Sequence, residues 1–145
     1  MVGVLDYDTD EFYDYHDEEV VDGLIRLSEA DRIIFYNGRG YDVPVIERLT
    51  NGLVTLRPSQ IIETLDLSRR YCKLDNHKLK TWGSMFDFPK GDHSDFTKWS
   101  PEMSLYCERD CRLTKLVFNF LNDMAVEQGR ACLIESARAA RNPSA

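Results

Sequence analysis

The sequence predicts a single α/β domain, and three observations support this fold class. Short runs rich in β-branched and aromatic residues alternate along the chain with stretches of helical periodicity. One run, Ile33–Tyr36, is followed by a turn and then by a helix start containing Asp42 and Pro44. The length of 145 residues and the hydrophobic fraction of 43% suit one domain, 1–145, with a buried core. In α/β folds, a carboxylate at the carboxyl end of a strand is often functional.

A hairpin and a helix are expected before the strand at Ile33–Tyr36. Val2–Tyr7 and Glu11–Tyr15 read as strands, and Asp8-Thr-Asp10 between them is turn-like. The acidic residues from Asp17 precede a helix that ends near Ala30, and acid at a helix start suits the helix macrodipole. We interpret the N-terminal concentration of acid as solvated surface.

The elements after the strand at Ile33–Tyr36 are predicted from hydrophobic periodicity and from residues that start or stop helices. A helix from Val43 to about Thr50 is ended by Asn51-Gly52. Ser100 and Pro101 predict the start of a long last helix. The other expected segments are a strand at Ile61-Ile62, helices over Glu63–Tyr71 and His77–Met85, a loop over Phe86–Trp99, and a frayed end at 138–145.

Charge and composition exclude several classes of protein. The net charge of −7 argues against broad, non-specific binding along a nucleic-acid backbone, although an enzyme could still grip a few nucleotides. With neither a membrane-length apolar run nor a signal peptide, we expect a cytoplasmic protein. Cys72, Cys107, Cys111 and Cys132 form no Cys-x-x-Cys pair and are expected to be reduced, partly buried thiols. A zinc site at Cys107 and Cys111 would need more ligands than are nearby.

Several segments, in their order and spacing, resemble a known nuclease family. They are 29–42 (Glu-Ala-Asp-Arg-Ile-Ile-Phe-Tyr-Asn-Gly-Arg-Gly-Tyr-Asp), 62–68 (Ile-Glu-Thr-Leu-Asp-Leu-Ser), 79–83 with 88–92, and 99–110, which ends in Tyr-Cys-Glu-Arg-Asp. Together they resemble the DEDD family of 3′–5′ exonucleases in its tyrosine subtype. The similarity is closest to the proofreading exonuclease domain of phage family-A DNA polymerases. It implies a ribonuclease H-like (DnaQ-like) mixed sheet flanked by helices on both sides.

The resemblance also implies roles for individual residues in two-metal phosphodiester hydrolysis. Two Mg²⁺ or Mn²⁺ ions would clamp a scissile phosphate at the 3′ end of single-stranded DNA. Asp110 would bind the metal on the nucleophile side, Asp42 would act at the second metal, and Tyr106 would orient the attacking water. Taken alone, Asp42 also reads as a helix-start cap and Tyr106 as a half-buried aromatic residue. The expected nucleic-acid contacts are Asn37, Arg39, Tyr41, Lys90 and Trp99.

The family's first motif, Asp-x-Glu on a central strand, has no clear counterpart in the sequence. In one alignment, Val2–Tyr15 is the hairpin that follows that strand, and the catalytic strand is missing. In the other, Asp6 and Asp8 form an Asp-x-Asp version of the motif and act as metal ligands. We favour the first alignment for two reasons. Residues 11–15 read as the return strand of a hairpin, and the stretch of sequence from Asp6 to Asp42 is short for a catalytic strand, a hairpin and a helix.

Loss of the central strand has consequences for fold and function. Its neighbours would keep unpaired edges in the middle of the sheet. The chain would then rearrange its sheet, borrow a strand from a partner chain, or form a homodimer across the gap. Three functions remain open: an active exonuclease, an inactive relative that binds nucleic acid or a polymerase-like protein, and a module whose sheet edge accepts a partner strand.

Overall fold

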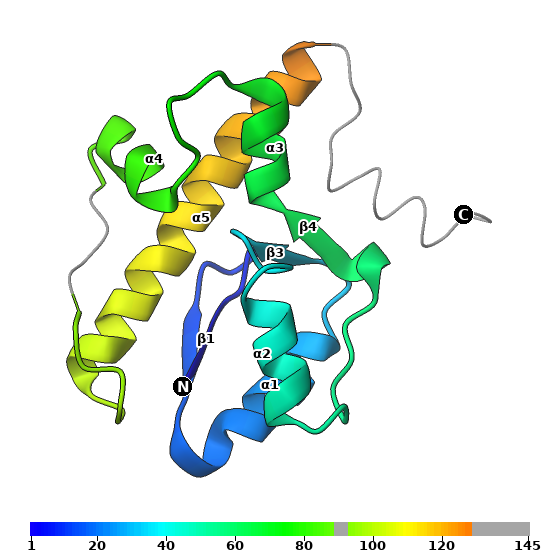
Figure 1. Cartoon of the computed structure of the whole chain (residues 1–145), viewed down its shortest axis with the longest axis vertical. Coiled ribbons are helices and arrows are strands. Elements are labelled where there is room, and N and C mark those ends of the chain that lie inside the picture. The colour runs from blue at the N-terminus through cyan, green and yellow to red at the C-terminus, as the bar shows by residue number, and fades with distance from the viewer. Residues whose placement is uncertain (89–92, 129–145) are drawn as a thin grey trace.

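Two separate pairs of strands form the β-structure of the computed structural model, which describes residues 1–88 and 93–128 (Figure 1). β1 (Val2–Leu5) and β2 (Phe12–Tyr15) form an antiparallel hairpin. β3 (Ile33–Phe35) and β4 (Ile61–Glu63) run parallel to each other. Within the described residues no strand lies between the pairs, so β1 and β3 each pair along one edge only.

Helices occupy most of the connections between and after the strands. They are a 3₁₀ turn at Asp17–Glu19, α1 (Val20–Ser28), α2 (Asp42–Leu49), a 3₁₀ turn at Pro58–Gln60, α3 (Thr64–Tyr71), α4 (Leu79–Met85) and α5 (Pro101–Glu127). The predicted elements are confirmed with small shifts: the first strand ends at Leu5, and the helix expected from His77 begins at Leu79. Residues 138–145, expected to fray, lie outside the described residues. None of the helices in the described part of the chain has the length and apolarity to cross a bilayer.

The predicted helix signals work through specific hydrogen bonds. The Ser100 hydroxyl accepts a bond from Met103 N at 3.2 Å and caps α5, whose first residue is Pro101. At the end of α2, Asn51 and Gly52 adopt positive φ values of 49° and 78°. Gly52 N then donates to Glu47 O at 2.9 Å, which closes the helix.

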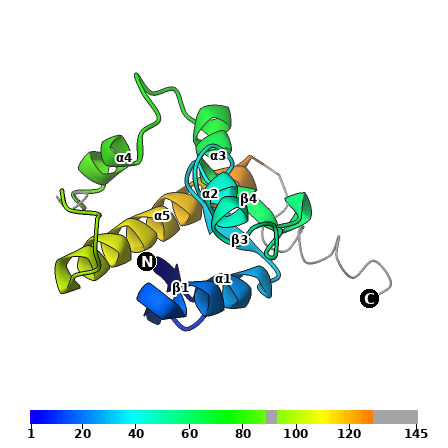
Figure 2. The same cartoon turned by 60° about the horizontal axis from the view of Figure 1, so that its bottom comes forward.

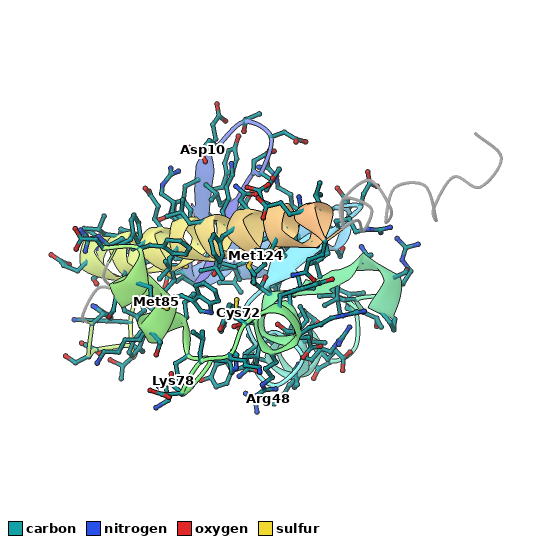
Figure 3. The ribbon with its side chains drawn as sticks, turned by 90° about the horizontal axis from the view of Figure 1, so that it is seen from above. Asp10, Arg48, Cys72, Lys78, Met85 and Met124 are labelled. Carbon is teal, nitrogen blue, oxygen red and sulfur yellow. The ribbon has the colours of Figure 1, made fainter. Side chains whose placement is uncertain are left out.

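Two hydrophobic clusters lie on the two sides of the strands. One joins α1, β3 and α2 and has as its buried members Leu24, Ile33, Phe35, Ile46, Val54 and Leu56. The other is centred on α4 and α5, with Trp82, Leu113, Val117 and Leu121 buried. At its margin the Cys72 thiol donates to Met124 Sδ at 3.8 Å, and these two side chains lie together between α3 and α5 (Figure 3). Helices therefore cover both faces, as the resemblance implies, although the described strands form two separate pairs and not one mixed sheet.

The long helix α5 connects the two strand pairs. It packs against β1, β3, α3 and α4, and it runs along the length of the molecule (Figures 1 and 2). Tyr7 OH donates to Asn119 Oδ1 at 2.7 Å, and Lys115 Nζ donates to Tyr7 O at 2.8 Å. These contacts attach the far end of the hairpin to the same helix that contacts the end of β3.

Candidate functional site

A buried carboxylate fixes the turn that follows β3. Glu63 ends β4 and is only 7% exposed. Its Oε2 accepts a hydrogen bond from Asn37 N at 2.7 Å, and its Oε1 accepts one from Arg39 N at 3.0 Å. Asn37 has a φ of 61°, in the left-handed region that asparagine tolerates better than most residues. Glu63 thus holds the turn from which α2 starts at Asp42.

Asp42 has an unusual environment for a carboxyl group at the first residue of a helix. Burial raises its pKa from 3.8 to about 6, and the negative charge of Glu63 adds to this effect. A carboxyl group in a cavity whose pKa is displaced by burial and by a like charge is a candidate for function. The arrangement would favour a cation or a proton beside Asp42.

Asp110 lies in the first half of α5 and lines the same cavity as Asp42. This cavity has a volume of about 1360 Å³, and β1, β3, α2 and α5 all contribute to its walls. The charges of both carboxylates also affect the thiol of Cys111. A hydrogen bond with Cys107 and burial raise the pKa of this thiol, and the charges of Asp110 and Asp42 raise it further. Two acidic residues from distant parts of the sequence therefore line one cavity and lie near one thiol.

The two cysteines beside Asp110 pack directly on β1. The hydrogen bond with Cys111 lowers the pKa of the Cys107 thiol, which burial alone would raise. The Cys111 thiol lies 3.9 Å from Gly3 O, as a weak donor. A Cβ atom built on Gly3 would lie 2.3 Å from Cys107 Sγ, so only glycine allows β1 to approach α5 this closely. The N-terminal half of β1 therefore lies beside Cys107, Cys111 and Asp110.

Tyr106 is half-buried one helical turn before Asp110. Its ring packs against His93 and Phe96, with centroid separations of 6.0 and 5.8 Å. Residues four apart share a face of a helix, which agrees with the predicted pairing of Tyr106 and Asp110. The walls of the cavity, however, do not include Tyr106.

Two of the expected nucleic-acid contacts line the cavity. They are Asn37 and Tyr41, and Tyr41 is 72% exposed beside Asp42. Arg39 points instead to α3, where its guanidinium forms a surface ion pair with Asp66 at 3.0 Å. The predicted contact Lys90 lies outside the described residues.

The structure places Trp99 in a contact between α5 and the hairpin region. Its ring stacks on His16 with a centroid distance of 3.9 Å. Its indole N–H donates to Ser104 Oγ at 2.7 Å, and the Ser104 hydroxyl donates to Asp14. One face of the Trp99 ring and its indole N–H are thus occupied by contacts within the chain.

Asp6 and Asp8 belong to the hairpin turn. Asp6 Oδ1 accepts hydrogen bonds from Asp8 N at 2.9 Å and Thr9 N at 3.1 Å, and the Thr9 and Asp8 amides lower its pKa. The structure forms the hairpin of the first alignment, whereas the alternative needs Asp6 and Asp8 on a central strand as metal ligands. Among the described strands β1 pairs only with β2, and it ends at Leu5, before both residues, although Asp6 and Asp8 line the same cavity as Asp42 and Asp110.

The fold combines two small sheets with helices, and Asp42 and Asp110 line one cavity in it. A family profile of the ribonuclease H superfamily matches residues 1–98, so the chain belongs to this superfamily. The matched region contains Asp42 and Glu63 and stops before α5, which carries Asp110. No curated protein matches the chain.

Members of this superfamily typically use divalent metal ions, and the site supplies only part of what such ions require. Asp42 and Asp110 are suitable oxygen ligands, and the raised pKa of Asp42 indicates a place where positive charge is favoured. Among residues 1–88 and 93–128, however, no three His, Cys, Asp or Glu side chains are grouped to hold an ion. The described residues alone therefore do not fit a catalytic metal pair, which needs several shared carboxylates.

Glu63 is the site residue that sequence reasoning missed. It lies in the segment 62–68 that carries part of the resemblance, but we gave it no role. The available signal was its position after Ile61-Ile62, because polar residues that follow neighbouring parallel strands meet at one edge of the sheet.

Proposed function

We propose that this chain is a nuclease-type domain of the tyrosine-subtype DEDD class, similar to polymerase proofreading domains, that engages the 3′ end of single-stranded DNA. The observation that carries the proposal is the shared cavity of Asp42 and Asp110, with Tyr106 one turn before Asp110. Superfamily membership supports the reaction class, phosphodiester hydrolysis. Hydrolysis would require ligands beyond these two carboxylates, because the described residues group no third one with them.

The surroundings of the site suggest how a strand end would be held. Tyr41 is exposed at the cavity and offers a ring on which a terminal base can stack. The Asn37–Arg39 turn, held by Glu63, sets the position of Asp42 relative to that ring. Mg²⁺ or Mn²⁺ would screen the charge of Asp42 and Asp110 against the incoming phosphate.

Binding of a fluorescent single-stranded oligonucleotide with a free 3′ end tests this proposal. We expect anisotropy to rise with Mn²⁺, and Asp110→Asn to weaken the metal-dependent binding by about tenfold, since one charged ligand is lost. Asp123→Asn is the matched control, because Asp123 is an exposed carboxylate on the same helix. A circular single strand, which has no end, should compete poorly.

The opposite pattern would contradict the proposal. If binding is equal with Mn²⁺ and with chelator, and Asp110→Asn behaves like Asp123→Asn, the two carboxylates do not form the site. That pattern would favour the second candidate, a non-catalytic relative that binds nucleic acid or protein through the same surface. The absence of a three-ligand group among the described residues is the observation that favours this alternative. It predicts metal-independent binding that is sensitive to Arg39→Ala.

A further inference from the structure

The basic side chains of this acidic protein are concentrated in one segment. Residues 64–85 form α3, α4 and the loop between them, and they carry five cationic and two acidic side chains, a net charge of +3. Because the whole chain has a net charge of −7, the remaining residues together carry −10. An anionic ligand is therefore attracted to this segment and repelled by most of the rest of the protein. The five cations are Arg69, Arg70, Lys73, Lys78 and Lys80.

Three of these cations line the cavity that holds the two candidate carboxylates. Arg69 lies on α3, Lys78 directly precedes α4, and Lys80 lies in the first turn of α4. All three side chains are exposed at the cavity wall, and we call them the basic rim. Arg70 and Lys73 belong to the same segment and are exposed, but they do not line the cavity.

The basic rim differs from the other cations of the cavity wall because its charges have no partners. Lys115 forms an ion pair with Asp10 at 3.1 Å. Arg26 donates to Tyr15 OH at 2.8 Å, and Arg32 donates to the carbonyl of the preceding residue at 2.8 Å. Within the described residues, the three side chains of the basic rim form neither an ion pair nor a hydrogen bond. Their charges are therefore available to a ligand.

Hydrogen bonds fix the loop that carries the basic rim. The Tyr36 hydroxyl donates to His77 O, and the Ser68 hydroxyl lies 2.7 Å from His77 Nδ1. The Trp82 indole N–H donates to the same Ser68 hydroxyl at 2.9 Å. Tyr36 follows β3 and directly precedes the turn that leads to α2. The backbone of Lys78, the residue after His77, is thus positioned relative to the turn at the candidate site, which lowers the cost of ordering it on binding.

The chemistry of the basic rim matches the phosphates of a nucleic-acid backbone. Lysine binds a phosphate oxygen as a point charge, and arginine can donate two parallel hydrogen bonds to it. A strand whose end lies beside Asp42 and Asp110 brings further phosphates toward the same cavity, where these carboxylates repel them. Three unpaired cations on the same wall offset this repulsion.

We propose that the basic rim binds backbone phosphates of a single strand on the 5′ side of its terminal nucleotide. The inference rests on the proposed function for the position of the strand end. It adds the residues that make the site favour a strand of several nucleotides over a free nucleotide, because a mononucleotide has no further phosphates to place on the rim.

The salt dependence of binding by the whole protein tests the inference. The probe is a fluorescent oligothymidylate of about eight nucleotides, within the usual range of single-strand site sizes, at constant Mn²⁺. Each cation that neutralises a phosphate of a single strand contributes about 0.7 to the slope of log K against log[NaCl]. We expect Arg69→Gln to lower the slope by about 0.7 and the double variant Lys78→Gln/Lys80→Gln to lower it by about 1.4.

A second double variant is the matched control. Arg70→Gln/Lys73→Gln removes two charges from the same segment but none from the cavity wall, so the slope should stay that of the unaltered protein. Competition by thymidine 5′-monophosphate gives a further readout. Its affinity should be equal in the unaltered protein and in Lys78→Gln/Lys80→Gln, whereas the oligothymidylate should bind the variant on the order of tenfold more weakly at low salt.

The outcomes separate this inference from the proposed function. If the two double variants lower the slope equally, the segment attracts the strand only through its net charge and the basic rim is overturned. Equal competition by polyglutamate of the same charge also overturns it, because the rim would then bind any anionic polymer. If Asp110→Asn has no effect and a circular strand competes well, the proposed function fails. The basic rim still stands in that case if its variants alone lower the slope.

Discussion

Asp42 carries a negative charge at pH 7 that the folded state disfavours. The group titrates near 3.8 in an unfolded chain and at about 6 in this structure, because burial and the charge of Glu63 disfavour ionisation. Between these values the folded state binds the proton more strongly, so stability from this group declines as pH rises from about 4 to about 6. A bound cation would reverse the penalty, and metal affinity should therefore rise over the same pH range.

Asp42→Asn should stabilise the metal-free protein at pH 7.5. The substitution removes a charge that the folded state disfavours, and since Asp42 is partly exposed we expect a gain of about 1–2 kcal/mol. At pH 4 the two proteins should unfold at similar urea concentrations, because the native carboxyl is then neutral. Equal stability differences at both pH values would contradict the role of ionisation.

Glu63→Gln should have two opposite effects. Glutamine has an oxygen at only one of the two positions that accept the Asn37 and Arg39 N–H groups, so one of these donors would face the side-chain NH2 group. We therefore expect a loss of about 1–3 kcal/mol in unfolding free energy. At the same time the pKa of Asp42 should fall, while burial keeps it above 3.8. Carboxyl titration by NMR measures the second effect. Asp66→Asn, which breaks only an exposed ion pair of Arg39, is the matched control and should change little.

At the scale of elements, a small buried network joins α3 to α4. Ser68 is fully buried, and its hydroxyl accepts a bond from the Trp82 indole N–H at 2.9 Å and lies 2.7 Å from His77 Nδ1. Trp82 is itself the centre of the second hydrophobic cluster. One hydroxyl therefore satisfies the buried indole N–H of Trp82 and also bonds the half-buried imidazole of His77.

Ser68→Ala should cost about 1–3 kcal/mol of unfolding free energy, because it leaves the indole N–H and the imidazole without this partner. Thermal or urea denaturation measures the loss. Ser84→Ala on α4 removes an exposed hydroxyl bonded only to Lys80 O and should be nearly neutral. Equal effects of the two substitutions would show that the network adds nothing beyond helix propensity.

The elements that sequence predicted well are those fixed by neighbouring residues. Ser100 and Pro101 start α5, and Asn51 with Gly52 ends α2, through bonds that span only a few positions. Features that depend on contacts between distant segments were harder to predict from the sequence. Glu63 gains its role only because β4 lies beside β3, and Trp99 is positioned by His16 from another part of the chain. A place for Asp42 and Asp110 in one cavity was expected only from the resemblance, since no local pattern links α2 to α5.

At the scale of the whole molecule, the net charge of −7 limits how nucleic acid can bind. We expect a shallow salt dependence for single-stranded DNA, corresponding to about one to three neutralised phosphates. Titrations at several NaCl concentrations, with Mn²⁺ held constant, measure this slope. A steep slope would indicate a broad basic surface and would contradict engagement of only a strand end.

The edges of β1 and β3 that pair with no other described strand also bear on how the molecule avoids aggregation. Exposed edges usually invite other sheets to dock, and proteins blunt them with charge or proline. Here α5 packs against both β1 and β3, and both strands line the cavity beside it. The packing of α5 along both strands thus takes the place of those devices.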